Sequence, residues 1–144
     1  MMAMTLIGGP YEDARATLAQ LLKQAPSLRE LGLAENAVFQ ADTAESPSMK
    51  PFLVIRWGDN EQMVGTTWVD PIDIWGYDEL GDYTRITAIV REAARYLSEE
   101  CIHVATASGR ISQFVDRGIG GDLADDGFDA VVKPYRMAAV GNGG

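Results

Sequence analysis

Four aspartates near the C-terminus are the first candidates for chemistry: Asp122, Asp125, Asp126 and Asp129. Their spacing invites comparison with an EF-hand calcium loop, which has glycine at its sixth position. When Gly127 is placed there, the third position is Ala124 and the twelfth is Lys133, and neither supplies a carboxylate. The segment is therefore predicted to be a solvated loop rich in turn-forming residues and not a calcium site.

The glycines just before this cluster resemble part of a phosphate-binding loop. Gly118, Gly120 and Gly121 lie close together, but such a loop also needs a following helix and usually a Lys with Ser or Thr. Asp122 follows instead, and its carboxylate would repel a phosphate. Nucleotide binding is not expected here.

His103 is the single histidine, so no pair of histidines can hold a metal ion. The nearest hydroxyls, Thr106 and Ser108, do not lie in a nucleophile-elbow pattern. We therefore expect no catalytic residue, no metal and no cofactor. A small metal-dependent hydrolase using Asp122, Asp126 and His103 remains as an alternative of a different class.

Aromatic residues indicate association rather than catalysis. Tryptophan and tyrosine are favoured at protein contacts. Five of them fall between residues 57 and 83, namely Trp57, Trp68, Trp75, Tyr77 and Tyr83. Part of this set is expected in the core and the rest at a surface that meets another protein.

Length and charge narrow the class of protein. The 144 residues carry 21 acidic and 12 basic side chains, for a formal charge of −9, which disfavours docking on nucleic acid phosphates or an anionic membrane. A single cysteine excludes an internal disulfide, and no apolar run is long enough for a membrane span. The expectation is one cytosolic soluble domain over residues 1–144, with residues 1–10 as a lead-in and 141–144 as a flexible tail.

Periodicity predicts the elements that position these residues. A helix is expected from residue 11 to about residue 24, where Pro26 stops it. Residues 52–57 and a run from Val64 form an antiparallel hairpin, followed by a turn at 76–81 and an amphipathic helix to Leu97. Residues 111–116 and 129–140 are further extended segments, and Pro71 and Pro134 suggest edges or bulges. The fold class is α/β in the broad sense (α+β), with a compact mixed or antiparallel sheet and two helices packed on it.

Five short motifs occur in order between residues 50 and 140: PFLVIRWG, IDIWGYD, GDYTRI, ASGRISQ and GDLADDGFDA. Together they resemble the tail terminator proteins of long-tailed, siphovirus-type phages of actinobacteria. The resemblance implies a compact α/β virion protein, assembled in the host cytoplasm and located at the head-proximal end of the tail. Another head–tail connector or completion protein is the alternative of the same class.

The resemblance also implies partners. Such proteins cap the tail tube as a ring, typically a hexamer, end tube polymerisation and present a surface to the head connector. The expected partners are other copies of the chain, the tail tube protein, the head–tail connector protein and phage DNA. The DNA would pass through the lumen without specific binding, and the acidic charge would keep it from being held.

On this interpretation the loops carry the contacts, since loops commonly carry binding. The candidate segments are residues 57–65, 76–82 and 117–127. Arg85 is expected to form an ion pair across a subunit boundary. The residues expected at a subunit or tube interface are Trp57, Tyr77, Asp78, Tyr83, Arg85, Asp122 and Asp126.

Overall fold

The computed structural model describes residues 9–40, 49–58, 62–106, 109–127 and 129–143. Its main helices are α1 (Gly9–Gln24), α2 (Pro26–Glu30) and α3 (Thr84–Arg95), and α3 continues into a π-helical turn, η2 (Tyr96–Glu100). A short 3-10 turn, η1 (Glu35–Ala37), leads into the first strand. Within the described ranges, no helix combines the length and the apolar character that crossing a membrane requires.

An eight-stranded sheet forms the rest of the fold. Its strands run in the order β1-β2-β4-β8-β6-β5, while β3 pairs with β4 and β7 pairs with β8. The pairings are antiparallel except for the parallel pair of β1 with β2. This confirms the predicted α+β class. The strand bounds are β1 (Val38–Gln40), β2 (Phe52–Trp57), β3 (Gln62–Val64), β4 (Thr67–Glu79), β5 (Val104–Thr106), β6 (Gly109–Ile119), β7 (Leu123–Asp125) and β8 (Ala130–Gly143).

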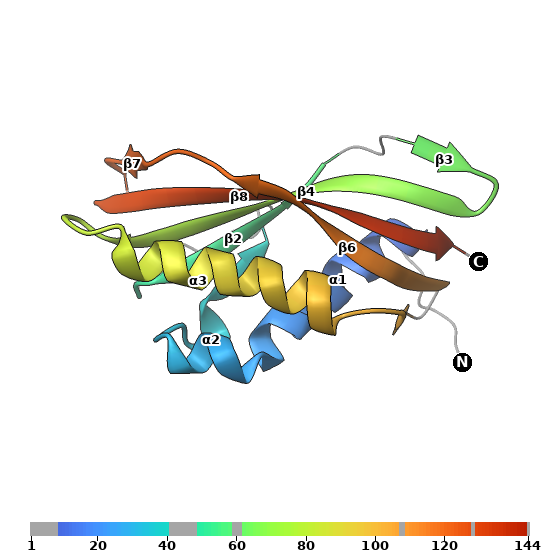
Figure 1. Ribbon diagram of the computed structural model, residues 1–144, viewed down its shortest axis with the longest axis horizontal. Coiled ribbons are helices and arrows are strands. Elements are labelled where there is room, and N and C mark those ends of the chain that lie inside the picture. The colour runs from blue at the N-terminus through green and yellow to red at the C-terminus, as the bar shows by residue number, and fades with distance from the viewer. Residues whose placement is uncertain (1–8, 41–48, 59–61, 107–108, 128, 144) are drawn as a thin grey trace.

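The helices cover one face of the sheet and leave the other face open (Figure 1). The apolar face predicted for α3 is confirmed, because Ile86, Ile89 and Val90 are fully buried against the sheet. Gly76 of β4 lies beneath this helix, where a Cβ atom would come 2.7 Å from side-chain carbons of Ile86 and Val90. A glycine is needed there because it lets the helix approach the strand closely.

The predicted turn at residues 76–81 is wrong at its start. β4 continues through Gly76 to Glu79, because it pairs without interruption along β8 as far as Ala130. The turn therefore begins at Leu80, and it includes Gly81 with a φ of 106°. Gly76 serves helix packing and not a change of chain direction.

Pro71 and Pro134 lie in the two central strands and not at sheet edges. Each carbonyl accepts a hydrogen bond from a glycine where the neighbouring strand is interrupted: Gly58 N to Pro71 O is 2.9 Å, and Gly120 N to Pro134 O is 2.8 Å. The N–H and C=O of one residue point to the same neighbour in an antiparallel pair, so the missing proline N–H also faces the gap. The interruptions between β2 and β3 and between β6 and β7 therefore accommodate prolines in a central position.

The C-terminal glycines belong to the sheet, contrary to the flexible tail expected at residues 141–144. β8 runs to Gly143, with Gly141 buried opposite Trp68 of β4, while residue 144 lies outside the described ranges. Strands β5 and β7 were also not predicted, since three-residue strands are too short to show periodicity. Of the 1–10 lead-in, residues 9 and 10 open α1, and residues 1–8 lie outside the described ranges.

Candidate interaction surface

The turn between β4 and α3 is organised by Asp82. Its Oδ1 atom accepts a hydrogen bond of 2.8 Å from the backbone N–H of Thr84. Hydrogen bonding with the Thr84 side chain, together with this backbone bond, lowers the pKa of the Asp82 carboxyl group. This bond satisfies the backbone N–H of Thr84, the first residue of α3, which has no partner within the helix. A contact within the four residues GDYT therefore stabilises the turn.

Asp78 and Arg85, which were both expected at a subunit interface, form an ion pair with each other within the chain. Arg85 Nε lies 2.9 Å from Asp78 Oδ2, and Arg85 Nη2 lies 2.7 Å from Asp78 Oδ1. This two-pronged geometry raises the pKa of Arg85 and ties the start of α3 to the end of β4. Asp78 is only 3% exposed, so it stabilises the turn from beneath.

Tyr77 and Trp57 are also engaged inside the fold. The Tyr77 ring stacks on Phe52 with ring centroids 4.6 Å apart, and burial raises the pKa of its phenol, with a further contribution from Asp125. Trp57 Nε1 donates a 2.7 Å hydrogen bond to Asp70 Oδ2. Both aromatic side chains are half-buried, so each presents only part of its surface to a partner.

Tyr83 joins the β4–α3 turn to β7. Its hydroxyl donates a 2.6 Å hydrogen bond to the carbonyl of Leu123, and the two segments lie at the same end of the sheet (Figure 1). Leu80 and Leu123 are exposed there, at 62% and 45%. We call this region the acidic end, defined by four exposed carboxylates: Glu79, Asp82, Asp122 and Asp126.

The acidic end brings together three of the predicted interface residues, Tyr83, Asp122 and Asp126. Asp122 is partly neutralised, since its Oδ1 lies 2.6 Å from Lys133 Nζ. Trp57 is not part of this end, because it pairs with Ile72 of β4 whereas the acidic end begins at Glu79. Tyr77, Asp78 and Arg85 lie beside the acidic end and support it.

The arrangement does not favour the alternative hydrolase. His103 directly precedes β5, which pairs with β6 near Ile111, opposite Gly141 of β8. Asp126 directly follows β7, which reaches Ala130 at the other end of β8. Eleven residues of strand span about 36 Å, so these side chains do not converge. Within the described part of the chain, no three His, Cys, Asp or Glu side chains are grouped so as to hold a metal ion.

The open face of the sheet carries a second polar feature that the sequence did not reveal. In the strand register, Arg56 of β2 lies opposite Asp73 of β4, which lies opposite Arg136 of β8, with Gly118 of β6 next in line. Arg117 lies at the bulge beside Gly118. We call Arg56, Asp73, Arg136 and Arg117 the arginine row. The four residues are far apart in sequence, so only the strand register places them together.

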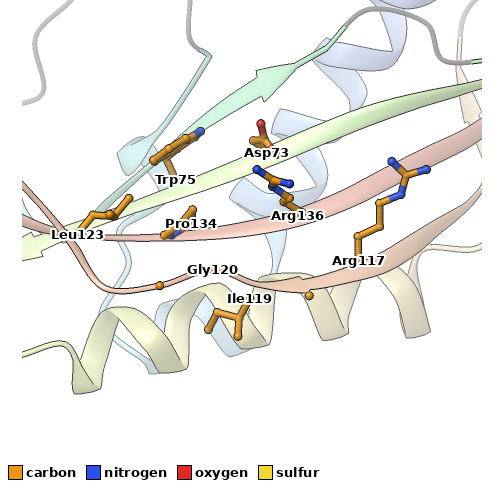
Figure 2. Close-up of a pocket in the computed structure, with 10 residues that line it drawn as sticks. Asp73, Trp75, Arg117, Ile119, Gly120, Leu123, Pro134 and Arg136 are labelled. Carbon is orange, nitrogen blue, oxygen red and sulfur yellow. The ribbon is translucent and has the colours of Figure 1, made fainter.

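A hollow of about 430 Å³ adjoins the arginine row. Figure 2 shows Trp75, Asp73, Arg136 and Arg117 standing on the side of the sheet opposite α3, whereas Ile119 points toward the helix. The hollow lies where β6 leaves β8, and Trp75, Leu123 and Pro134 supply its apolar wall. The Trp75 Nε1 atom is buried and has no hydrogen-bond partner among the residues that the structure describes.

Comparison with known proteins gives one informative result. No protein-family model matches the sequence, and no curated protein matches it. Among solved structures, the fold is similar to a chain in "Virion of native gene transfer agent (GTA) particle". The likeness has a TM-score of 0.68 and 14% sequence identity, and it covers 98% of this chain and 100% of that chain. At this identity the likeness establishes a shared fold.

Proposed function

We propose that this protein is a virion structural protein of a phage-like particle, and specifically the tail terminator. The observation that carries the proposal is the shared fold with a chain of a virion particle, which extends over nearly the whole of both chains. The ordered motifs from PFLVIRWG to GDLADDGFDA support the same assignment, because they resemble tail terminators.

The architecture suits a subunit of a closed ring. One face of the sheet is covered by helices and the other is open, so different surfaces are available on the two sides of each subunit (Figure 1). A ring needs a heterologous interface, in which one patch of each subunit meets a different patch on the next. The proposed ring has six copies, a number that follows from the resemblance to tail terminators.

The mechanism is occlusion and requires no covalent chemistry. The ring occupies the surface to which the next tail tube subunit would add, and it offers that subunit no matching surface. Its other side joins the tube to the head connector. DNA passes through the lumen, and the charge of −9 limits its retention by the protein.

Electron microscopy of particles produced without this protein tests the proposal. Loss of a terminator is expected to give tails of irregular, extended length that are not joined to heads. Tails of normal, uniform length would contradict it. Tails of uniform length that fail only in joining would favour the alternative, another head–tail connector or completion protein.

A further inference from the structure

The open face of the sheet is more apolar than a face in contact with water normally is. Side chains alternate between the two faces along a strand, and the solvated face of an antiparallel sheet is usually polar. In β4 and β8, however, five successive outward positions hold a single charged residue each, and all but two of these ten residues keep part of their surface exposed. The positions are Val69, Pro71, Asp73, Trp75 and Tyr77 in β4, and Val132, Pro134, Arg136, Ala138 and Val140 in β8. A contiguous apolar face of this kind indicates a surface that another molecule covers.

The charges in the middle of this face alternate in sign across three strands. Arg56 of β2 lies opposite Asp73, and Asp73 lies opposite Arg136. Adjacent strands are about 4.8 Å apart, so the order base–acid–base extends over about 10 Å. Both arginines are exposed, and neither forms an ion pair with any residue in the described ranges. We call Arg56, Asp73 and Arg136 the sheet triplet; its best partner is a surface with the order acid–base–acid.

The end of α3 presents this opposite order. The guanidinium group of Arg95 lies between two carboxylates, with Nη1 3.6 Å from Glu99 Oε1 and Nη2 2.7 Å from Glu100 Oε2. Arg95 also donates hydrogen bonds to Glu92, so three carboxylates share one guanidinium group. The side chains of Glu99 and Glu100 are 66% and 51% exposed and can accept hydrogen bonds from a further cation. We call Arg95, Glu99 and Glu100 the helix-end triplet.

Apolar side chains lie beside both triplets. Ile102 follows the helix-end triplet and is 53% exposed. On the open face, Val115 of β6 is 39% exposed and lies opposite Ala138, the next outward residue after Arg136 along β8. Burial of such side chains stabilises a contact with another protein, whereas a phosphate backbone offers them nothing to pack against. The two surfaces therefore favour a protein partner over nucleic acid.

The two triplets lie on opposite sides of the subunit. The helices cover one face of the sheet, while Asp73 and Arg136 stand on the other face (Figure 1, Figure 2). They therefore cannot meet within one chain. Complementary surfaces on opposite sides let successive copies join head to tail, which is the arrangement that a heterologous ring requires.

We propose that the open sheet face of one copy receives the helix-end triplet of the next copy. The two glutamates then face Arg56 and Arg136, and the arginine between them faces Asp73. The inference rests on the proposed ring and specifies its subunit interface. Each charge meets one of opposite sign, so copies with a charge of −9 can associate, and the contact is expected to weaken as salt rises.

Sedimentation of the purified full-length chain over a range of concentrations at low salt tests the interface. The wild type is expected to form assemblies larger than dimers. Arg56→Glu/Arg136→Glu reverses both arginines of the sheet triplet and should give monomers. Lys23→Glu/Lys50→Glu makes the same change in net charge, from −9 to −13, outside both triplets and should assemble like the wild type.

A second pair of variants tests the helix-end triplet. Glu99→Arg/Glu100→Arg reverses its two carboxylates and should also give monomers. Glu30→Arg/Glu35→Arg makes the same change in net charge, from −9 to −5, at other exposed positions on the helical side and should assemble like the wild type.

Mixing the two monomeric variants shows whether the triplets meet each other. In a ring that alternates Arg56→Glu/Arg136→Glu with Glu99→Arg/Glu100→Arg, every second contact joins two reversed triplets and the others join two unchanged ones. Assemblies should therefore reappear in the mixture. Circular dichroism spectra matching the wild type would show that both variants are folded.

Three results would overturn the inference: a monomeric wild type at every concentration, equal assembly of either triplet variant and the wild type, or a mixture that stays monomeric. Equal assembly of the sheet-triplet variant, accompanied by loss of a retardation of duplex DNA that the wild type shows, would assign the open face to nucleic acid instead. Each of these results would leave the proposed terminator function standing, since that function is judged separately by tail length in particles.

Discussion

Replacing Gly141 by alanine should destabilise the fold, because this residue of β8 lies between the two neighbouring strands β4 and β6. A Cβ atom there would lie 2.6 Å from the backbone carbonyl oxygen of Arg110 and would overlap the ring of Trp68. Trp68 is 2% exposed and cannot move outward freely. Overpacking costs about 1–3 kcal/mol, and the lower chain entropy of unfolded alanine offsets about 0.4–1 kcal/mol. We expect a net loss of about 1–2 kcal/mol in the free energy of unfolding.

Urea denaturation followed by tryptophan fluorescence measures this loss. With an m-value of about 2 kcal/mol per molar urea, the midpoint should fall by about 0.5–1 M. Gly121→Ala is the matched control, since a Cβ atom there meets nothing within 4 Å, and its midpoint should stay near that of the wild type. Equal midpoints for Gly141→Ala and the wild type would refute the placement of the C-terminal glycines in the sheet.

Further predictions concern ionisable groups. Tyr135 donates a 2.6 Å hydrogen bond to Asp116, and burial together with this bond raises the pKa of its phenol to about 12. The stabilisation that the protonated Tyr135 phenol provides is therefore complete below pH 10 and lost as pH rises toward 12. In urea titrations at alkaline pH, the free energy of unfolding should decline less for Tyr135→Phe than for the wild type, and an identical decline would contradict the assignment. Burial also raises the pKa of the Cys101 thiol, so a thiol reagent should label it slowly in the native protein and rapidly in urea, with rapid native labelling as the opposing result. Asp78→Ala removes both hydrogen bonds to Arg85 and should lower the unfolding free energy by about 1–2 kcal/mol in urea titrations. The loss stays this small because the half-exposed Arg85 regains contact with water, and an unchanged unfolding free energy would show that the pair contributes nothing to stability.

Sequence patterns predicted the long elements because long elements repeat their periodicity. The apolar face of α3 and the hairpin pairing of β2 with β4 follow directly from residue spacing. Gly76 was misassigned because a glycine that permits a close helix contact has the same local signature as a glycine in a turn. Only the position of α3 on the sheet distinguishes the two roles.

The candidate surface was less accessible to sequence reasoning. Tyr83 and Asp122 fall near each other because a hydrogen bond from Tyr83 joins the turn to β7, a strand too short to predict. The arginine row was missed altogether, since its members come from different strands and meet only through the register. Conversely, Asp78 looked like a turn residue, and its burial depends on β4 extending beyond Gly76.

The central claim is that this chain forms the ring that ends the tail tube. A cryo-electron microscopy reconstruction of the neck of intact particles tests it most directly, because the fold has a broad sheet with helices on one face that is recognisable in density (Figure 1). We predict one ring of this fold seated on the last layer of tube subunits, on the side toward the head. Finding the fold elsewhere in the particle, or in a ring that contacts the portal and not the tube, would contradict the account.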